Sequence, residues 1–308
     1  MPEPSHEAPD LDRGPAPHGG LPDPVRREDR VGGRRVVWHE AGRPDGPTLL
    51  LLHGGGADAA LMSWSLVLRA FPDRRLVAPD LPGYGETPRF RGPYTVEALA
   101  AWTEGFAEAA RLAPGSVMGI SMGGATAIAY ALRAPHRVRA LVPVAAFGLG
   151  GPAPLPRTLY LLSRLPLTLL VYGAVALNDR AARRALRNVF ADLDRVPPDL
   201  LDAVRAAARV QLRTGSFLAF MRGETHWRGF RTDLSERLPA LAVPTLFVHG
   251  TQDALVPLAA SERAARLVPG ARLARIEGAG HLPMREDPEA FERAVRPFLD
   301  AAHPVRRD

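Results

Sequence analysis

The sequence of 308 residues contains neither cysteine nor lysine. Without cysteine, the chain can form no disulfide bond and has no thiolate to act as a nucleophile or metal ligand. All 39 basic residues are arginine, against 33 acidic residues, and the formal net charge is +6. The arginines are scattered and are not interleaved with aromatic residues, so we do not expect nucleic-acid binding.

Long apolar runs are also missing. The longest candidate, residues 165–177, has 13 residues and contains Pro166, so no membrane-spanning segment is expected. The N-terminal sequence MPEPSHEAPDLDRGPAPHGG has acidic residues and prolines where a signal peptide needs a basic start and an apolar stretch. We therefore expect a cytoplasmic protein. No group of His, Asp and Glu has the spacing of metal ligands, so no metal is expected. No organic cofactor is expected either.

Composition divides the chain into an ordered centre and two loose ends. Apolar residues make up 46% of the sequence, which suits one large α/β domain. Residues 1–30 are rich in proline, glycine and charge and cannot bury enough apolar surface to offset their ordering entropy. They are predicted to be a disordered arm, and residues 302–308 a loose tail.

Short apolar runs alternate with helical patterns such as residues 95–112 and 123–133. The runs predicted to be strands are residues 35–40, 48–52, 75–78, 116–120, 138–145, 244–249 and 271–276. Continuous apolar strands separated by helices predict a mostly parallel sheet with helices on both faces. The alternation stops at residues 147–239, which are rich in leucine and arginine and read as helices. This lid segment is predicted to be inserted between core segments 31–146 and 240–301.

A single serine lies among glycines in Gly119-Ile120-Ser121-Met122-Gly123, after a predicted strand and before a predicted helix. A side chain there must sit on a tight strand-to-helix turn, and the flanking glycines remove Cβ atoms that would clash. The turn carries the hydroxyl clear of the sheet, at the N-terminus of a helix whose free N–H groups suit a developing oxyanion. Ser121 is the candidate nucleophile.

A serine nucleophile needs a histidine base, and the histidine needs a carboxylate to fix its tautomer. Among the nine histidines, His281 stands out, because a glycine-rich turn carries it past the end of a predicted strand. His249 ends a strand itself and is predicted to be a packed core residue. Asp253 lies just beyond that strand. Ser121, Asp253 and His281 all follow the carboxyl ends of strands, where ligand sites of parallel sheets lie.

The chain resembles the α/β-hydrolase superfamily over about residues 32–300. The resemblance rests on five segments in the family's order: Leu51-Leu52-His53-Gly54-Gly55-Gly56, Asp80-Leu81-Pro82-Gly83-Tyr84-Gly85, Gly119-Ile120-Ser121-Met122-Gly123-Gly124, His249-Gly250-Thr251-Gln252-Asp253 and Gly280-His281. It implies an eight-stranded, mostly parallel sheet with helices on both faces and a helical lid after the sixth strand. The lid segment stands where that lid would be.

The resemblance also implies roles for residues around the nucleophile. The backbone N–H groups of Met122 and Gly55 would form the oxyanion hole, with Gly56 as the near alternative to Gly55. His53 would brace the glycine loop, and Asp80 would hold the turn that follows it. The candidates for the substrate pocket are Gly56, Phe217, Met221 and Leu282.

These residues predict a serine hydrolase that cleaves a small or medium apolar carboxylic ester through an acyl-enzyme. Serine at position 121 argues against haloalkane dehalogenases and epoxide hydrolases of this fold, which use aspartate there. A carbon–carbon bond hydrolase of the meta-cleavage-product type remains an alternative, although Leu282 replaces the aromatic residue that usually follows the histidine in those relatives. A cofactor-free lyase and a ligand receptor also remain open, and the oligomeric state cannot be read from the sequence.

Overall fold

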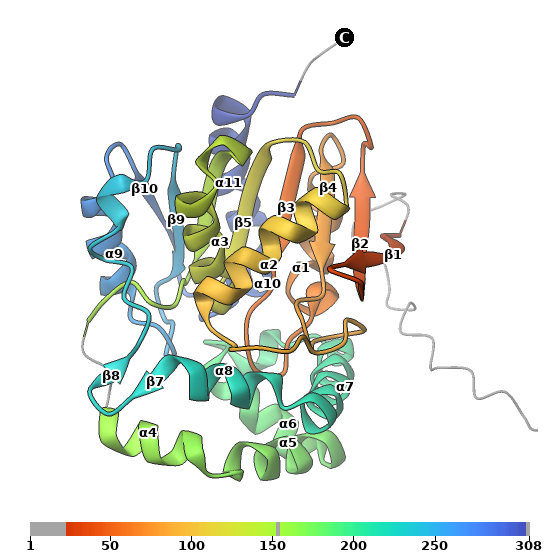
Figure 1. Cartoon of the computed structure of the whole chain (residues 1–308), viewed down its shortest axis with the longest axis vertical. Helices are drawn as coiled ribbons and strands as arrows, with labels where there is room; N and C mark the ends of the chain where they lie inside the picture. The colour runs from red at the N-terminus through yellow and green to blue at the C-terminus, as the bar shows by residue number, and fades with distance from the viewer. Residues whose placement is uncertain (1–22, 152–154, 306–308) are drawn as a thin grey trace, which may run out of the picture.

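The computed structural model describes residues 23–151 and 155–305, and its centre is an eight-stranded sheet (Figure 1). The strand order is β1-β2-β4-β3-β5-β6-β9-β10. The strands are β1 (Val25–Val31), β2 (Arg34–Gly42), β3 (Thr48–Leu52), β4 (Arg75–Pro79), β5 (Gly115–Ile120), β6 (Val138–Val144), β9 (Leu246–Gly250) and β10 (Arg272–Ile276). β2 runs antiparallel to both of its neighbours, and the strands from β4 to β10 are parallel. The predicted α/β class and mostly parallel sheet are confirmed.

Strand β1 corrects the prediction that the disordered arm extends to residue 30. Its sequence, VRREDRV, has no apolar alternation, and its side chains are almost all exposed. Its order comes instead from backbone pairing with β2, from Val25 opposite Glu40 to Val31 opposite Arg34, which no hydrophobic pattern reports. The rest of the predicted arm, residues 1–22, lies outside the described residues.

Helices cover both faces of the sheet. They are α1 (Ala60–Ala70), α2 (Val96–Ala109), α3 (Met122–Arg133), α9 (Leu258–Leu267), α10 (Pro283–Glu286) and α11 (Pro288–Ala302). Thr95 and Asp287 begin α2 and α11 by accepting hydrogen bonds from backbone N–H groups of the first turn. Alternate residues of β3 point to opposite faces: Leu50 joins the core cluster under α2, α3 and α9, and Leu51 joins the one under α1 and α11.

The prediction of a loose tail from residue 302 is wrong at its start. Helix α11 continues through Ala302, and His303 is held in place beyond it. The backbone carbonyl of His303 accepts a 2.9 Å hydrogen bond from the fully buried guanidinium of Arg74, and its ring lies 3.1 Å from the hydroxyl of Ser116. A buried guanidinium must find acceptors, and this requirement orders the end of the helix. Residues 306–308 lie outside the described residues.

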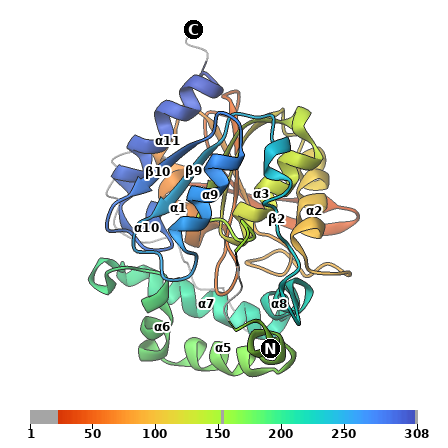
Figure 2. The same cartoon turned by 90° about the vertical axis from the view of Figure 1, so that its left-hand side faces the viewer.

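The lid segment follows β6 and lies across the carboxyl edge of the sheet (Figures 1 and 2). It folds mainly as helices, as predicted: α4 (Pro156–Arg164), α5 (Leu167–Leu177), α6 (Asp179–Ala185), α7 (Pro198–Thr214) and α8 (Ser216–Glu224). The segment also contains two short strands that the helical prediction did not include: β7 (Thr225–His226) and β8 (Gly229–Phe230) form a hairpin too short to leave a periodic pattern. Within the described residues, no single helix has the length and apolar character of a membrane span.

Short 3-10 turns complete the described chain. They are η1 (Pro135–Arg137), η2 (Leu186–Asn188), η3 (Leu193–Arg195) and η4 (Leu238–Ala240). The first leads into β6, and the last spans the end of the lid segment, shortly before β9 begins.

The close packing of α3 on the sheet generates a stability prediction. A methyl group at Gly123 would lie 2.2 Å from the carbonyl oxygen of Leu52 and 2.3 Å from that of His53. We expect Gly123→Ala to lower the free energy of unfolding by about 1–3 kcal/mol, because backbone atoms on both sides would have to shift. Urea unfolding followed by circular dichroism measures the change.

Gly173 offers the matched control, because it lies in α5 with no described atom within 4 Å of an added methyl group. Gly173→Ala should be neutral or raise the free energy of unfolding by about 0.5–1 kcal/mol, since alanine costs less conformational entropy in a helix. Equal losses in the two variants would contradict the steric argument.

Candidate active site

Ser121 sits on a strained turn between β5 and α3. Its backbone angles are φ 54° and ψ −115°, a conformation that residues other than glycine rarely adopt. The turn is closed by a 2.9 Å hydrogen bond from the Ser121 N–H to the carbonyl of Val144. A Cβ atom at Gly119 would lie 2.2 Å from the carbonyl oxygen of Gly123, so the turn has no room for one. The structure therefore has the tight turn that the glycine spacing predicts.

The carboxylate of Asp253 is fully buried in the loop after β9 and is held from both sides. One oxygen accepts hydrogen bonds from the N–H groups of Leu255 at 2.8 Å and Val256 at 3.0 Å. The other lies 2.8 Å from Nδ1 of His281 and 3.2 Å from Nε2 of His249. Because a carboxylate can only accept, Nδ1 of His281 carries the proton and its Nε2 is left as the basic nitrogen.

The same contacts set the charge of Asp253. Burial by itself would raise the pKa of this carboxyl group, but the hydrogen bonds from His249 and His281 outweigh it and hold the pKa well below its usual range. Asp253 is therefore ionised at neutral pH, as a carboxylate that stabilises an imidazolium has to be.

His249 confirms one prediction and adds a contact that sequence reasoning missed. It is a fully buried core residue, as expected. Its Nδ1 pairs with the hydroxyl of Ser261 at 2.8 Å, and its Nε2 lies 2.9 Å from the carbonyl of Val256, next to Asp253. A histidine that closes a strand four residues before the candidate aspartate is the only trace of this contact in the sequence.

The three predicted catalytic residues leave the sheet at one edge. The Ser121 N–H bonds the end of β6, and the Ala145 N–H bonds Val248 of β9 at 2.9 Å. β9 and β10 remain paired in parallel up to Ile276. The carboxyl ends of β5, β6, β9 and β10 are thus adjacent, and the loops that carry the serine, the acid and the histidine face the lid segment (Figure 2).

The glycine loop after β3 lies against the nucleophile. A methyl group at Gly54 would be 3.7 Å from Cβ of Ser121. The Gly54 N–H donates to the buried Asp58 carboxylate at 2.7 Å, so this group is not free to bind an oxyanion. The next N–H along the loop belongs to Gly55, the predicted donor. His53 braces the loop as expected: its Nδ1 pairs with the Gly54 carbonyl at 2.7 Å, and its Nε2 accepts from the Leu81 N–H at 2.9 Å.

Apolar side chains surround this loop. A Cβ atom at Gly55 would lie 2.8 Å from the ring of Phe217 in α8 and 3.5 Å from the sulfur of Met122. Gly56 has a positive φ of 78° and faces the hydroxyl of Tyr172 in α5, a residue the sequence did not single out. The other two pocket candidates are packed in the core: Met221 is half-buried one turn further along α8, and Leu282 is buried beside α10.

Asp80 is a structural residue, as predicted. Its side-chain oxygens accept from the N–H groups of Ala60 at 3.0 Å and Glu86 at 2.9 Å. Gly85 has a φ of 48°, and a Cβ atom there would lie 2.0 Å from an Asp80 oxygen. The carboxylate therefore ties the start of α1 to the turn that follows β4.

Glu286 is a second residue that sequence reasoning missed. Its carboxylate accepts the N–H groups of Gly280 at 2.9 Å and Ala191 at 2.7 Å, and the His281 N–H donates to the carbonyl of Val189 at 2.7 Å. Burial raises the pKa of Glu286, although the two backbone N–H groups partly counter it. The histidine loop is thus fastened to residues 189–191 of the lid segment. The only signal in the sequence is a carboxylate five residues after the histidine.

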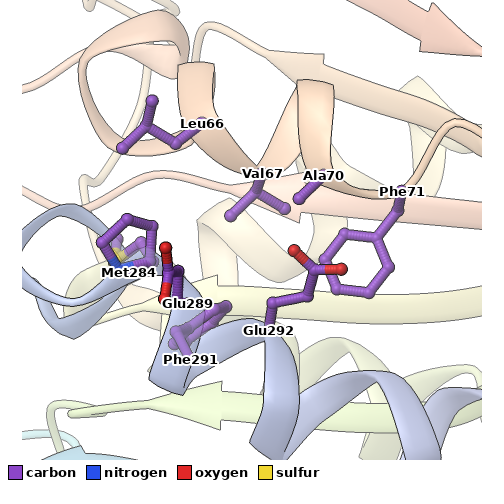
Figure 3. Close-up of a pocket in the computed structure, with 9 residues that line it drawn as sticks. Leu66, Val67, Ala70, Phe71, Met284, Glu289, Phe291 and Glu292 are labelled. Atoms are coloured by element: carbon purple, nitrogen blue, oxygen red, sulfur yellow. The ribbon is translucent and has the colours of Figure 1, made fainter. Parts of the chain in front are cut away.

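Two further observations bear on ligands. Among the described residues, no group of three or more His, Cys, Asp and Glu is arranged to hold a metal ion. Figure 3 shows residues such as Val67, Phe71 and Phe291, which line a crevice between α1 and α10–α11. The crevice has a volume of about 20 Å³. This is room for little more than a water molecule, and no predicted site residue lines it, so it is a packing gap rather than a substrate site.

Comparisons with known proteins show the family to which the chain belongs. A family model for the alpha/beta hydrolase fold matches residues 47–288. The chain is 30% identical to a 2-hydroxymuconate semialdehyde hydrolase of Pseudomonas putida, over 91% of this chain and 96% of that protein. It is 32% identical to a pimeloyl-[acyl-carrier protein] methyl ester esterase of Aromatoleum aromaticum, over 79% and 94%. A solved structure of a thermophilic esterase from Thermogutta terrifontis is 25% identical with a TM-score of 0.71, over 92% and 100%.

The lowered pKa of Asp253 predicts a pH dependence of stability. Because the folded-state pKa lies below the unfolded value of about 3.9, the ionised group stabilises the fold fully above about pH 4, and this contribution is lost as the pH falls further. At pH 7 we expect Asp253→Asn to be less stable than the wild type by about 1–3 kcal/mol, the usual cost of a buried donor left unpaired. Urea unfolding at a series of pH values should show that the difference in free energy of unfolding between the two proteins becomes smaller below about pH 4.

Asp194 provides the control, because its side chain is 92% exposed. Asp194→Asn should match the wild type at every pH. If the stability difference between the wild type and Asp253→Asn stayed constant down to about pH 3, the charge of this carboxylate would not be what stabilises the fold.

Proposed function

The chain belongs to the α/β-hydrolase family, and on that premise we propose that it is a serine hydrolase that cleaves small or medium apolar carboxylic esters. The observation that carries the proposal is the 2.8 Å contact between the buried Asp253 carboxylate and Nδ1 of His281. It leaves the other ring nitrogen basic, at the same edge of the sheet as the strained Ser121.

The proposed reaction proceeds in two steps. Ser121 Oγ attacks the ester carbonyl carbon while His281 Nε2 takes its proton, and Asp253 stabilises the resulting imidazolium. The N–H groups of Met122 and Gly55 bind the tetrahedral oxyanion. His281 then protonates the departing alkoxide, which leaves an acyl-enzyme. Water, deprotonated by the same nitrogen, attacks the acyl carbon. The bond to Ser121 Oγ then breaks, and the imidazolium returns the proton to Oγ, which releases the acid and restores the serine.

The surroundings favour an apolar ester. Phe217 and Met122 lie against the loop that carries Gly55, so a substrate carbonyl at the oxyanion hole would have apolar neighbours. The names of two of the three similar proteins above include an esterase activity. Leu282, rather than an aromatic residue, follows the histidine.

A second candidate is hydrolysis of a carbon–carbon bond. It is supported by the 30% identity to a 2-hydroxymuconate semialdehyde hydrolase, which covers nearly the whole of both chains. The same serine, histidine and aspartate would take part, but the leaving group would be a carbon atom that must be protonated. The two candidates therefore differ in the bond that is cut.

The first test uses p-nitrophenyl esters of increasing acyl chain length. The wild type should turn them over, and the best chain length should report the size of the pocket. Ser121→Ala should lower kcat by at least about 10⁴-fold, because the nucleophile is lost. Ser235→Ala is the control, since that hydroxyl bonds Asp233 rather than any site residue, and it should keep wild-type activity.

The substrate panel should also contain a vinylogous 1,5-diketone of the kind formed by ring cleavage. Turnover of this compound without turnover of any ester would replace the proposal by the carbon–carbon candidate. Turnover of neither would point to a lyase or a receptor. Equal ester turnover by the wild type and Ser121→Ala would remove Ser121 from the reaction.

The role of Asp253 makes a separate kinetic prediction. In Asp253→Asn the side-chain amide can present its N–H₂ group to His281, which favours the wrong ring tautomer. We expect kcat to fall by about 10⁴-fold while KM changes little, because binding of the substrate does not involve this group. Steady-state kinetics on the best p-nitrophenyl ester measure both constants. A large rise in KM with unchanged kcat would contradict the assignment.

A further inference from the structure

The outer surface of the lid segment is unusually apolar. Thirteen large apolar side chains are exposed in the described part of the chain, and eight of them lie within residues 155–177. We call these eight the outer lid face: Leu155, Leu161, Leu162, Leu165, Leu167, Leu170, Val171 and Leu177. Helices α4 and α5, which carry the face, form the layer of the molecule farthest from the sheet (Figures 1 and 2). Soluble monomers rarely expose so many large apolar residues together.

The face follows helical periodicity and is not an unfilled part of the core. In α5, Leu167, Leu170, Val171 and Leu177 share one side of the helix by their spacing, and Leu170 is 70% exposed. The opposite side of α5 is packed: Tyr172 and the residues after it on that side are buried against the rest of the protein. The helix therefore has its core contacts already and presents a second apolar side outward.

Cationic and aromatic side chains border the face. Arg157 lies over the ring of Trp227 at 5.5 Å, and Arg164 lies over the ring of Tyr160 at 4.5 Å. Trp227, at the tip of the β7–β8 hairpin, is half exposed. In the described part of the chain, neither arginine has a carboxylate partner within ion-pair distance, although Arg164 also donates to the carbonyls of Arg222 and Thr225, each at 3.2 Å. Tryptophan, tyrosine and arginine together are typical of surfaces that meet the headgroup region of a bilayer.

The charge of the whole chain is concentrated in the same segment. Residues 147–239 contain 14 arginines and eight acidic residues, an excess of six that equals the net charge of the chain. The remaining residues are therefore electrically balanced. A positive excess in the segment that carries the apolar face complements a surface that is apolar inside and negatively charged outside.

We propose that the outer lid face docks on a membrane surface that contains anionic phospholipid. The apolar side chains would enter the boundary between headgroups and acyl chains, with Arg157 and Arg164 at the phosphates. The face would lie in the surface rather than span it, because α4 and α5 meet at a bend of 72° and α4 carries both arginines. This docking does not depend on the reaction proposed above.

The test is sedimentation of the full-length protein with sucrose-loaded vesicles, either of phosphatidylcholine alone or mixed with phosphatidylglycerol. We expect binding to the mixed vesicles that weakens as salt rises, and weaker binding to phosphatidylcholine alone. The double variant Leu170→Asn, Leu177→Asn should bind at least about 10-fold more weakly, since both side chains are exposed and both would enter the lipid. Arg157→Gln with Arg164→Gln should remove most of the preference for the anionic vesicles.

Leu255→Asn is the matched control, because Leu255 is 48% exposed outside the lid segment, and it should bind like the wild type. Turnover of a soluble short-chain ester by each variant shows separately whether the reaction is intact. No binding of the wild type to either vesicle would overturn the proposal. Equal binding of the wild type to vesicles with and without phosphatidylglycerol would also overturn it, as would full binding of the leucine variant. The proposal would fail as well if the wild type were a dimer that the leucine substitutions convert to a monomer.

Discussion

The candidate site depends on one buried charge. Asp253 receives two backbone N–H groups from its own loop and a contact from each of two histidines, so neither its position nor its ionisation is left to solvent. The backbone bonds fix one oxygen, and this aims the other at His281. A carboxylate buried without such partners would be protonated instead. The orientation of the histidine therefore follows from how the loop after β9 folds.

The backbone around Ser121 packs closely because glycines, which have no side chain, occupy the positions two residues before and after it. At Gly119 and Gly123 the chain comes so close to its neighbours that a methyl group would overlap backbone atoms. This closeness lets α3 begin directly beneath the serine and lets the glycine loop lie against it. The side chains of Asp58 and His53 then hold the loop through bonds to its backbone, and so help to place Gly55, one of the two predicted oxyanion donors.

Much of this arrangement could be predicted from the sequence, because seven strands and the residues after them carry local patterns. Ser121, Asp253 and His281 each follow an apolar run and lie among glycines or loop residues. Strand β1 could not be predicted, since its order comes from pairing with β2 and not from its own side chains. The contacts of His249 and Glu286 could not be predicted either, because each joins residues whose closeness exists only in the folded sheet. Periodicity marks α5 as apolar but does not say which side is covered.

The bonds from the histidine loop to residues 189–191 limit how the lid can move. Glu286 joins Gly280 to Ala191, and the His281 N–H bonds Val189, so this end of the lid is tethered to the proposed base. Moving residues 189–191 away from the sheet would break these bonds and free the loop that carries His281. An opening that keeps the base aligned has to pivot about this tether and occur at the other end, where α4 and α5 follow Gly148, Gly150 and Gly151, all with positive φ. Any opening movement would then leave the part of the lid segment around residues 189–191 in place.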